Sequence, residues 1–242
     1  MPEKKFAFES GKIALALIFP LGLGDCVVAR KVFNALVELS PNCIIDTFCL
    51  SDKHKVFANA FIGDSNNLNL ILLREELTAE ILPKYDLCLR IEGTSMILPD
   101  SGNVERLQAL SSALFESLVK IDAYNKQNIY SFGSSFLSCS LRNHVISRIL
   151  RKKYIYFLSC GGALPLQEEG AYIPLSKKYA NEWKKLKLNR YITIYSDIES
   201  DTEQPKTKTW PIQYLREYVS LMKRKFPRLK IVQVGGGRGI LR

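Results

Sequence analysis

Residues 12–50 read KIALALIFPLGLGDCVVARKVFNALVELSPNCIIDTFCL, and this stretch decides the fold class. Residues 12–19 form a continuous apolar run, which is typical of a strand buried in a sheet. Two glycines then break the run. The apolar residues that follow recur at helical spacing: Val28, Val32, Leu36 and Leu39. The helix is expected to end at Ser40, because a residue before proline disfavours the helical region. With a second strand at residues 43–50, the order strand, glycine turn, helix, strand predicts an α/β fold.

The same alternation continues along the chain. Apolar runs at residues 68–73, 87–91 and 154–158 predict further strands. Residues 104–120 predict a helix. Strands that alternate with helices indicate a mostly parallel sheet with helices on both faces. Ligands of such sheets bind at the carboxyl ends of the strands, where the glycine turn is expected to lie.

A second, smaller unit follows a basic amphipathic helix predicted at residues 176–188. Its elements are a strand at 191–195, a helix at 212–226 that begins after Pro211, and a strand at 230–234. A single β-α-β of this size is too small to enclose its own core. We therefore expect this unit to be incomplete or to complete its core by packing against the first unit.

The composition limits the classes of partner and site. The chain carries 34 Lys and Arg against 24 Asp and Glu, a net charge of +10, which favours anionic partners. The cysteines form no CxxC pair and the two histidines lie far apart, so neither a zinc site nor a disulfide framework is expected. Most cysteines lie in apolar runs and are expected to be buried. The longest apolar stretch, residues 13–24, is too short to cross a bilayer.

The glycine turn, residues 20–25 (PLGLGD), is the first candidate site. Gly22 and Gly24 allow the backbone to turn sharply and to approach a ligand closely. The helix behind them offers unpaired N–H groups to an anion. Asp25 is expected at the N-terminus of this helix, where it either caps the helix or acts as a catalytic carboxylate.

An NAD-binding alternative uses the same turn. Gly22 and Gly24 are two residues apart and Asp46 follows about twenty residues later, as in a dinucleotide fingerprint. Val27 stands in place of the third glycine, so the fingerprint is only partial.

Two basic segments are further candidates. Residues 206–211 (KTKTWP) bring Lys208, Thr207 and Thr209 to a helix entrance, which suits a phosphate, although a solvated basic loop has the same composition. Residues 142–190 contain eleven Lys or Arg against three Glu. This excess is compatible with RNA, with anionic lipid head groups or with a solvated helix face, and no RNA-binding motif accompanies it.

The sequence resembles the heptosyltransferase-like glycosyltransferases of family nine. Residues 12–49 resemble the opening of that family, with a loop that ends in Gly-Asp before the first helix. The segment YDLCLRIEG (residues 85–93) resembles a later family strand. YITIY and KTKTWPIQYLREYVSLMKRKFPRLKIVQVGG (residues 191–195 and 206–236) are similar to the opening of its donor domain.

The resemblance implies a GT-B arrangement of two Rossmann-like domains. The acceptor-side domain would span residues 1–172, a linker helix 173–189, and a partial donor-side domain, its first β-α-β, 190–242. The implied reaction is metal-independent, inverting transfer from a nucleotide sugar, without a cofactor. Asp25 matches the family aspartate that acts as general base, and Lys208 matches the lysine that contacts donor phosphate.

Two departures accompany the resemblance. Ser196 and Asp197 stand where relatives often carry a histidine or arginine and a glycine, and an acid there would repel a diphosphate. The family's later glycine-rich donor segments are absent, so we expect a truncated form whose activity is reduced or lost.

The expected acceptor is a bacterial surface glycan or a lipid-linked saccharide such as lipopolysaccharide. The expected location is the cytoplasm, with peripheral contact to the anionic inner membrane and no nucleic-acid partner. A noncatalytic glycan- or partner-binding module is the alternative.

Overall fold

The computed structural model describes residues 5–20, 23–98, 102–130, 143, 145, 147–167, 181–182, 184–188, 190–195 and 212–234. The chain divides into two compact units, Met1–Pro174 and Leu175–Arg242. In the described ranges, no helix has both the length and the apolar character that a membrane span requires.

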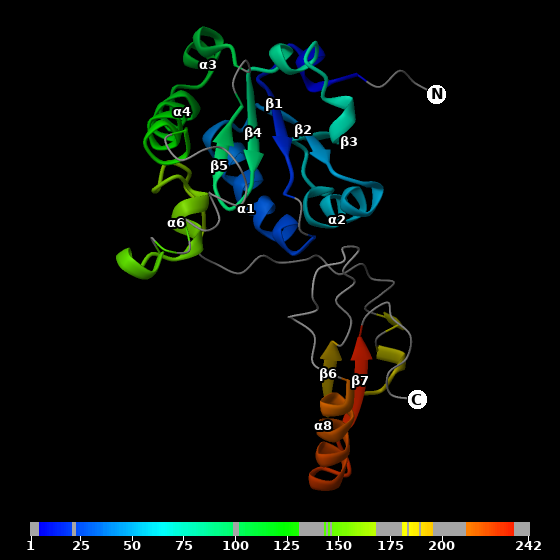
Figure 1. The fold of residues 1–242 in the computed structure, drawn as a ribbon. Helices are drawn as coiled ribbons and strands as arrows, with labels where there is room; N and C mark the ends of the chain where they lie inside the picture. The colour runs from blue at the N-terminus through cyan, green and yellow to red at the C-terminus, as the bar shows by residue number, and fades with distance from the viewer. Residues whose placement is uncertain are drawn as a thin grey trace. The chain divides into compact units, whose positions relative to one another are not determined.

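The larger unit is built on a five-stranded sheet (Figure 1). Its strands are β1 (Ala14–Ile18), β2 (Ile44–Cys49), β3 (Leu68–Leu73), β4 (Leu87–Ile91) and β5 (Ser95–Ile97). Their order in space is β3-β2-β1-β4-β5. The first four are parallel, so that Leu15 lies between Ile45 on one side and Leu87 on the other, and β5 is antiparallel to β4. The predicted α/β class with a mostly parallel sheet is confirmed.

Among the described residues, the α-helices of this unit pack on one face of the sheet. They are α1 (Leu23–Leu39), α2 (Asp52–Ile62), α3 (Val104–Leu110), α4 (Ser112–Asn125) and α6 (Tyr154–Leu158). Phe33 of α1, Phe61 of α2 and Ile121 of α4 join Leu15 and Leu17 in one buried cluster. The helix predicted after the glycine turn is confirmed as α1, and it ends at Leu39, before Ser40 and Pro41.

In the described part of the chain, the opposite face is covered by short 3₁₀ helices, so of the helices predicted on both faces the α-helices lie on one face. η1 (Ala7–Ser10) and η3 (Leu82–Lys84) flank this face. Tyr85 packs edge-on against Phe8 and Phe48, with ring centroids 5.2 and 6.1 Å away. Ala14 and Ala16 of β1 belong to the same cluster, and their small side chains leave room for these rings in place of a helix.

Two further predictions require correction. The helix predicted over residues 104–120 is broken at Ser111, whose backbone is extended and whose Oγ accepts the Leu114 N–H at 3.3 Å as the cap of α4. The strand predicted at residues 154–158 is the helix α6. A short apolar run fits either element, and here Phe157 and Leu158 are buried while their carbonyls accept the hydroxyls of Thr94 and Ser95.

The smaller unit contains β6 (Tyr191–Tyr195), α8 (Ile212–Lys225) and β7 (Lys230–Val234). β6 and β7 are parallel, with Ile194 beside Gln233, so the predicted β-α-β is confirmed. Its core is small and consists of Ile194, Leu215 and Val219, with Ile231 packed against them. Of the helix predicted at residues 176–188, residues 181–182 and 184–188 are described. Residues 181–182 and 184–185 are helical, whereas 186–188 are not, so the predicted helix extends too far.

Candidate functional site

The carboxyl ends of the four parallel strands meet at one edge of the sheet, which we call the carboxyl edge. From β1 the sheet extends to β2 and β3 on one side, and β4 pairs with the other side of β1. Open α/β sheets bind ligands at such a switch point, here between the ends of β1 and β4. α1 begins after β1 at this point, and Arg90 and Glu92 lie at the end of β4.

Arg90 and Glu92 form an ion pair at the end of β4. The Arg90 Nε donates to Glu92 Oε1 at 2.7 Å, and Nη2 donates to the same oxygen. The Glu92 side chain is fully buried, whereas the Arg90 side chain is 34% exposed. Glu92 Oε2 is buried and has no hydrogen-bond partner among the described residues. Part of the Arg90 guanidinium is therefore exposed to solvent, and one oxygen of the Glu92 carboxylate accepts no hydrogen bond from the described residues.

Arg74 adds a second guanidinium to this edge. It opens η2 (Arg74–Glu76), directly after β3, and its Nη2 donates to the carbonyl of Phe19 at the end of β1. Burial lowers the pKa of Arg74, and the neighbouring positive charge of Arg90 lowers it further, while Glu92 opposes this shift. Its Nε is buried and unpartnered within the described part of the chain.

This arrangement is suited to an anion. Arg90 pairs with Glu92, and the Glu92 charge only partly offsets the effect of Arg90 on Arg74. An added negative charge would therefore relieve the repulsion between Arg74 and Arg90. The planar fork of a guanidinium matches the oxygens of a phosphate or carboxylate group. The first turn of α1 lies at the same edge and contributes the positive end of the helix dipole. The chemistry that these groups offer is binding and charge neutralisation.

The cysteines are buried, as the sequence predicts. Cys26, Cys43, Cys49, Cys88 and Cys160 are buried and form no disulfide within the described residues, and Cys139 lies outside them. Burial raises the pKa of the Cys49 thiol to about 12, and the nearby Cys26 adds to this shift. Such thiols stay protonated near neutral pH and do not act as nucleophiles. In the ranges that the structure describes, no group of three or more His, Cys, Asp or Glu is placed to hold a metal ion.

The structure places only part of the predicted site. Gly24 and Asp25 are the second and third residues of α1, so Asp25 lies in the first turn and not at the N-cap position. The Asp25 side chain is not among the described parts of the chain. Other predicted site residues lie outside the described residues altogether: Gly22, Thr207, Lys208 and Thr209, together with Ser196 and Asp197. Their predicted roles stay predictions.

Asp46, the acidic residue of the NAD-binding alternative, has a different place. It is fully buried within β2. Its carboxylate accepts the N–H of Ala7 and the hydroxyl of Tyr85 at 2.7 Å, the amide of Asn69 at 2.8 Å and the N–H of Leu70 at 3.1 Å. Burial raises its pKa, against the effect of these four donors. Asp46 therefore ties η1 and β3 to β2 and is not available to a ribose, which removes this support for NAD binding.

Arg74, Arg90 and Glu92 do not appear among the sequence predictions, although a signal for them exists. Arg74 follows the apolar run LNLILL, and Arg90 and Glu92 interrupt and follow the run LCLRI. A charged side chain at the end of a buried parallel strand lies at the edge where ligands bind. Reading the ends of the predicted strands for charge would have identified all three.

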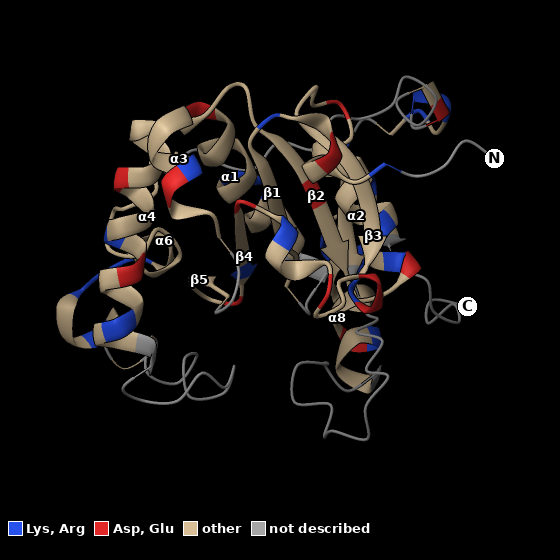
Figure 2. Ribbon diagram, turned by 90° about the horizontal axis from the view of Figure 1, so that it is seen from above, with Lys and Arg blue, Asp and Glu red and all other residues tan. Residues whose placement is uncertain are grey.

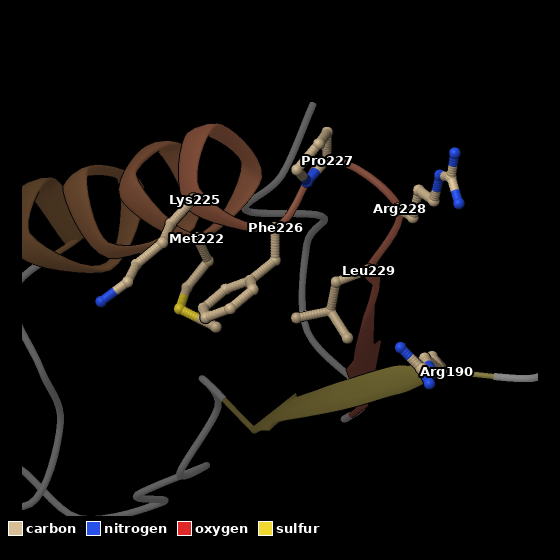
Figure 3. A pocket seen from close by; sticks show the side chains of 7 residues that line it. All are labelled: Arg190, Met222, Lys225, Phe226, Pro227, Arg228 and Leu229. Atoms are coloured by element: carbon tan, nitrogen blue, oxygen red, sulfur yellow. The ribbon is translucent and has the colours of Figure 1, made fainter.

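The smaller unit has a hollow of about 410 Å³ between the end of α8 and the start of β6 (Figure 3). Met222, Phe226 and Leu229 point toward one another there, and Arg228 points away from them. Arg190 and Lys225 complete the lining with Pro227. Because Arg190 precedes β6, this hollow lies at the amino end of the strands, away from the carboxyl end where the resemblance implies donor phosphates.

Comparison with protein-family models finds no match, and no curated protein matches. Among solved structures, the chain is similar to the crystal structure of the glycosyl transferase family 9 from Veillonella parvula DSM 2008. The two share 14% sequence identity with a TM-score of 0.43. The alignment covers 92% of this chain and 62% of that chain, so the present chain spans less than two thirds of the length of the solved one.

Proposed function

We propose that this chain is a glycosyltransferase-type protein, which transfers a sugar from a nucleotide-activated donor to a saccharide or lipid-linked acceptor. The observation that carries the proposal is the positive carboxyl edge, where Arg74 and Arg90 lie at the switch point of the sheet. Asp25 is in the first turn of α1, the helix that begins at this same point. The order of the sequence motifs, from Gly-Asp to Lys-x-Trp-Pro, supports the same function.

In the proposed reaction, an anionic group of the substrate binds to the guanidinium groups and the acceptor hydroxyl lies near Asp25. Asp25 takes the proton of that hydroxyl while its oxygen forms a bond to the anomeric carbon of the donor. The bond from that carbon to the diphosphate breaks on the opposite side, which inverts the anomeric configuration. Lys208 would neutralise charge on the departing nucleoside diphosphate, and the hydroxyls of Thr207 and Thr209 would donate hydrogen bonds to it, without a metal ion.

The proposed acceptor is a bacterial surface glycan or lipopolysaccharide precursor, met at the cytoplasmic face of the inner membrane. The donor sugar is heptose-like or a related sugar. Both proposals follow from the resemblance to family nine, and the cationic edge supports them because such acceptors carry phosphate or carboxylate groups.

The test compares two aspartates in the first turns of neighbouring helices. Release of nucleoside diphosphate from a panel of sugar nucleotides is measured for the wild type, Asp25→Asn and Asp52→Asn. Asp52 is an exposed acid in the first turn of α2 and pairs with Lys55 at 3.5 Å, so its substitution costs a similar helix-dipole interaction. The proposal expects Asp25→Asn to slow release by about 10²-fold or more and Asp52→Asn to leave it unchanged. Equal rates for Asp25→Asn and the wild type would exclude Asp25 as the base.

A noncatalytic anion-binding module is the second candidate. The observation in its favour is that the described groups of the site, Arg74, Arg90 and the buried Glu92, bind charge and offer no proton acceptor to a substrate hydroxyl. Thermal unfolding with sugar nucleotides and with inorganic phosphate separates the two functions. Stabilisation by one sugar nucleotide beyond that by phosphate supports the transferase, and equal stabilisation supports the module.

A further inference from the structure

A sharp corner of the larger unit combines cations with exposed apolar side chains. Residues 148–154 (RILRKKY), which we call the 148–154 corner, join a helical segment that ends at Leu150 to α6. Arg151 has a positive φ of 50°, which ends the helical segment and turns the chain. All seven residues of the corner are exposed. Four of them are Lys or Arg and three are Ile, Leu or Tyr.

The apolar side chains of this corner are exposed. Ile149 is 72% exposed and Leu150 is 53% exposed, and Val145, one helical turn before Ile149, is 48% exposed. Tyr154 at the other end is 45% exposed. Ile149 is among the most exposed large hydrophobic residues of the described chain. A merely solvated basic face would carry polar residues at these positions, so the apolar side chains require another explanation.

The charge around the corner has one sign. Between residues 123 and 167 the sequence contains six Lys or Arg and no Asp or Glu. Figure 2 shows Lys and Arg in blue at the end of the unit that carries α4 and α6. Lys152 lies over the Tyr156 ring, with Nζ 4.9 Å from the centroid. Beside it is a hollow of about 420 Å³, lined in part by Arg151, Lys152, Lys153 and Tyr156. This hollow offers cations and an aromatic hydroxyl to an anionic head group.

The corner is held firmly to the rest of the unit on both sides. Before it, Asn143 is buried and its amide donates to the carbonyl of Gly93 at 3.0 Å. After it, the carbonyls of Phe157 and Leu158 accept the hydroxyls of Thr94 and Ser95 at 2.7 and 2.8 Å. The apolar side chains are therefore presented to solvent by a braced backbone.

We propose that the 148–154 corner docks this protein on the surface of an anionic lipid bilayer. Lys and Arg pair with lipid phosphates, Ile149 and Leu150 enter the boundary between head groups and acyl chains, and Tyr154 lies at the interface. Charge complementarity favours this occupant, because a run of cations without any acid repels a second copy of the same surface. The exposed side chains of Ile149 and Leu150 favour a bilayer over a soluble anion, because a soluble anion would not bury these apolar side chains.

This inference extends beyond the proposed transfer reaction and does not depend on it. The corner is tied to Gly93, Thr94 and Ser95, which directly follow Glu92 of the carboxyl edge. A bilayer bound at the corner would thus hold the carboxyl edge at a set position relative to lipid-borne substrates.

The test is co-sedimentation of the full chain with phosphatidylcholine vesicles, with and without phosphatidylglycerol. The wild type is expected to bind only the vesicles that contain phosphatidylglycerol, and added salt should release it. Lys152→Gln with Lys153→Gln should weaken binding by roughly fivefold for each charge removed. Ile149→Ser with Leu150→Ser should weaken it by at least roughly tenfold at unchanged charge. Because all four positions are exposed, each variant is expected to keep the circular dichroism spectrum of the wild type.

Matched controls exclude effects of general charge and general hydrophobicity. Lys184→Gln with Lys185→Gln removes two adjacent exposed cations from the other unit, and Val56→Ser removes a 69% exposed apolar side chain from α2. Both are expected to bind as the wild type does. Equal binding to neutral vesicles, equal losses in the controls, or retention of binding by the corner variants would overturn the proposal. Absence of vesicle binding together with a change in sedimentation coefficient would also overturn it and would identify the corner as a protein contact. Vesicle binding without any sugar-nucleotide turnover would reject the transferase and leave this inference standing.

Discussion

The Nε of Arg90 donates to Oε1 of Glu92 at 2.7 Å, and this hydrogen bond joins the last part of β4 to the residue that follows it. The carboxylate is fully buried and the guanidinium is one third exposed. Glu92 therefore depends on Arg90 for compensation of its charge, whereas Arg90 keeps a side open to a ligand. Arg74, on the neighbouring side of the same edge, is held by the carbonyl of Phe19.

Glu92→Gln should lower the free energy of unfolding by about 1–3 kcal/mol. The substitution removes the buried partner of Arg90, and solvent screening of the exposed guanidinium keeps the loss below that of a fully buried pair. Urea unfolding followed by circular dichroism measures this loss. Glu105→Gln, at an exposed acid in the first turn of α3, is the control and should change stability by less than about 0.5 kcal/mol. Equal changes in the two variants would show that the Arg90–Glu92 pair has no special role.

The same Glu92→Gln variant should bind inorganic phosphate more tightly than the wild type, by roughly fivefold or more. A unit charge a few ångströms away contributes on the order of 1 kcal/mol even in water, and the amide no longer competes with the ligand for Arg90. Isothermal titration calorimetry with phosphate measures the change. Arg90→Gln is the opposite variant and should abolish binding, so phosphate affinity that is indifferent to both substitutions would place the anion site elsewhere.

Asp46→Asn should destabilise the larger unit by about 2–3 kcal/mol, because an amide NH₂ cannot accept the hydrogen bonds that one carboxylate oxygen receives from Ala7 and Tyr85. Asp64→Asn, at an exposed acid after α2, serves as the control and should be neutral. Urea unfolding of both variants checks this. A neutral effect of Asp46→Asn would contradict the structural role that we assign to it.

Stability should fall at alkaline pH because of the buried thiols. Burial raises the pKa of Cys88 from 9.0 to about 12, so the folded protein retains a proton that the unfolded chain loses above about pH 9. The contribution of this thiol is fully present below about pH 9 and is lost as the pH rises toward about 12, at up to ~1.4 kcal/mol per pH unit. Cys88→Ala should reduce the slope of the free energy of unfolding against pH by about that amount. The other titrating groups are common to both proteins, so an identical slope in the variant would refute the explanation.

Much of the fold could be predicted from residue patterns. Continuous apolar runs identified β1 to β4, and helical spacing together with Pro41 identified both the face and the end of α1. α2 was missed although its buried residues recur at helical spacing, at His54, Ala58, Phe61 and Ile62. The first four residues of α2, DKHK, are polar or charged, so the helical spacing of its buried residues was not recognised. The run YIYFL was predicted as a strand because five apolar residues fit either element. In the structure it is α6, whose last two carbonyls accept the hydroxyls of Thr94 and Ser95.

The sequence by itself determined the α/β class, the parallel strands and the helix α1 after the first strand, because each depends on residues that are near one another in the chain. Only the tertiary structure decided which side chains share the carboxyl edge. Arg74 meets a carbonyl 55 residues earlier, and the charge of Arg90 at the end of β4 acts on Arg74 after β3, because the order of strands brings their ends to one edge. The same holds for Asp46. The sequence pattern allowed it to bind a ligand, but in the structure its carboxylate accepts hydrogen bonds from four donors in separate segments of the chain. Strand order and burial arise from the packing of the whole sheet, so no local stretch of sequence contains them.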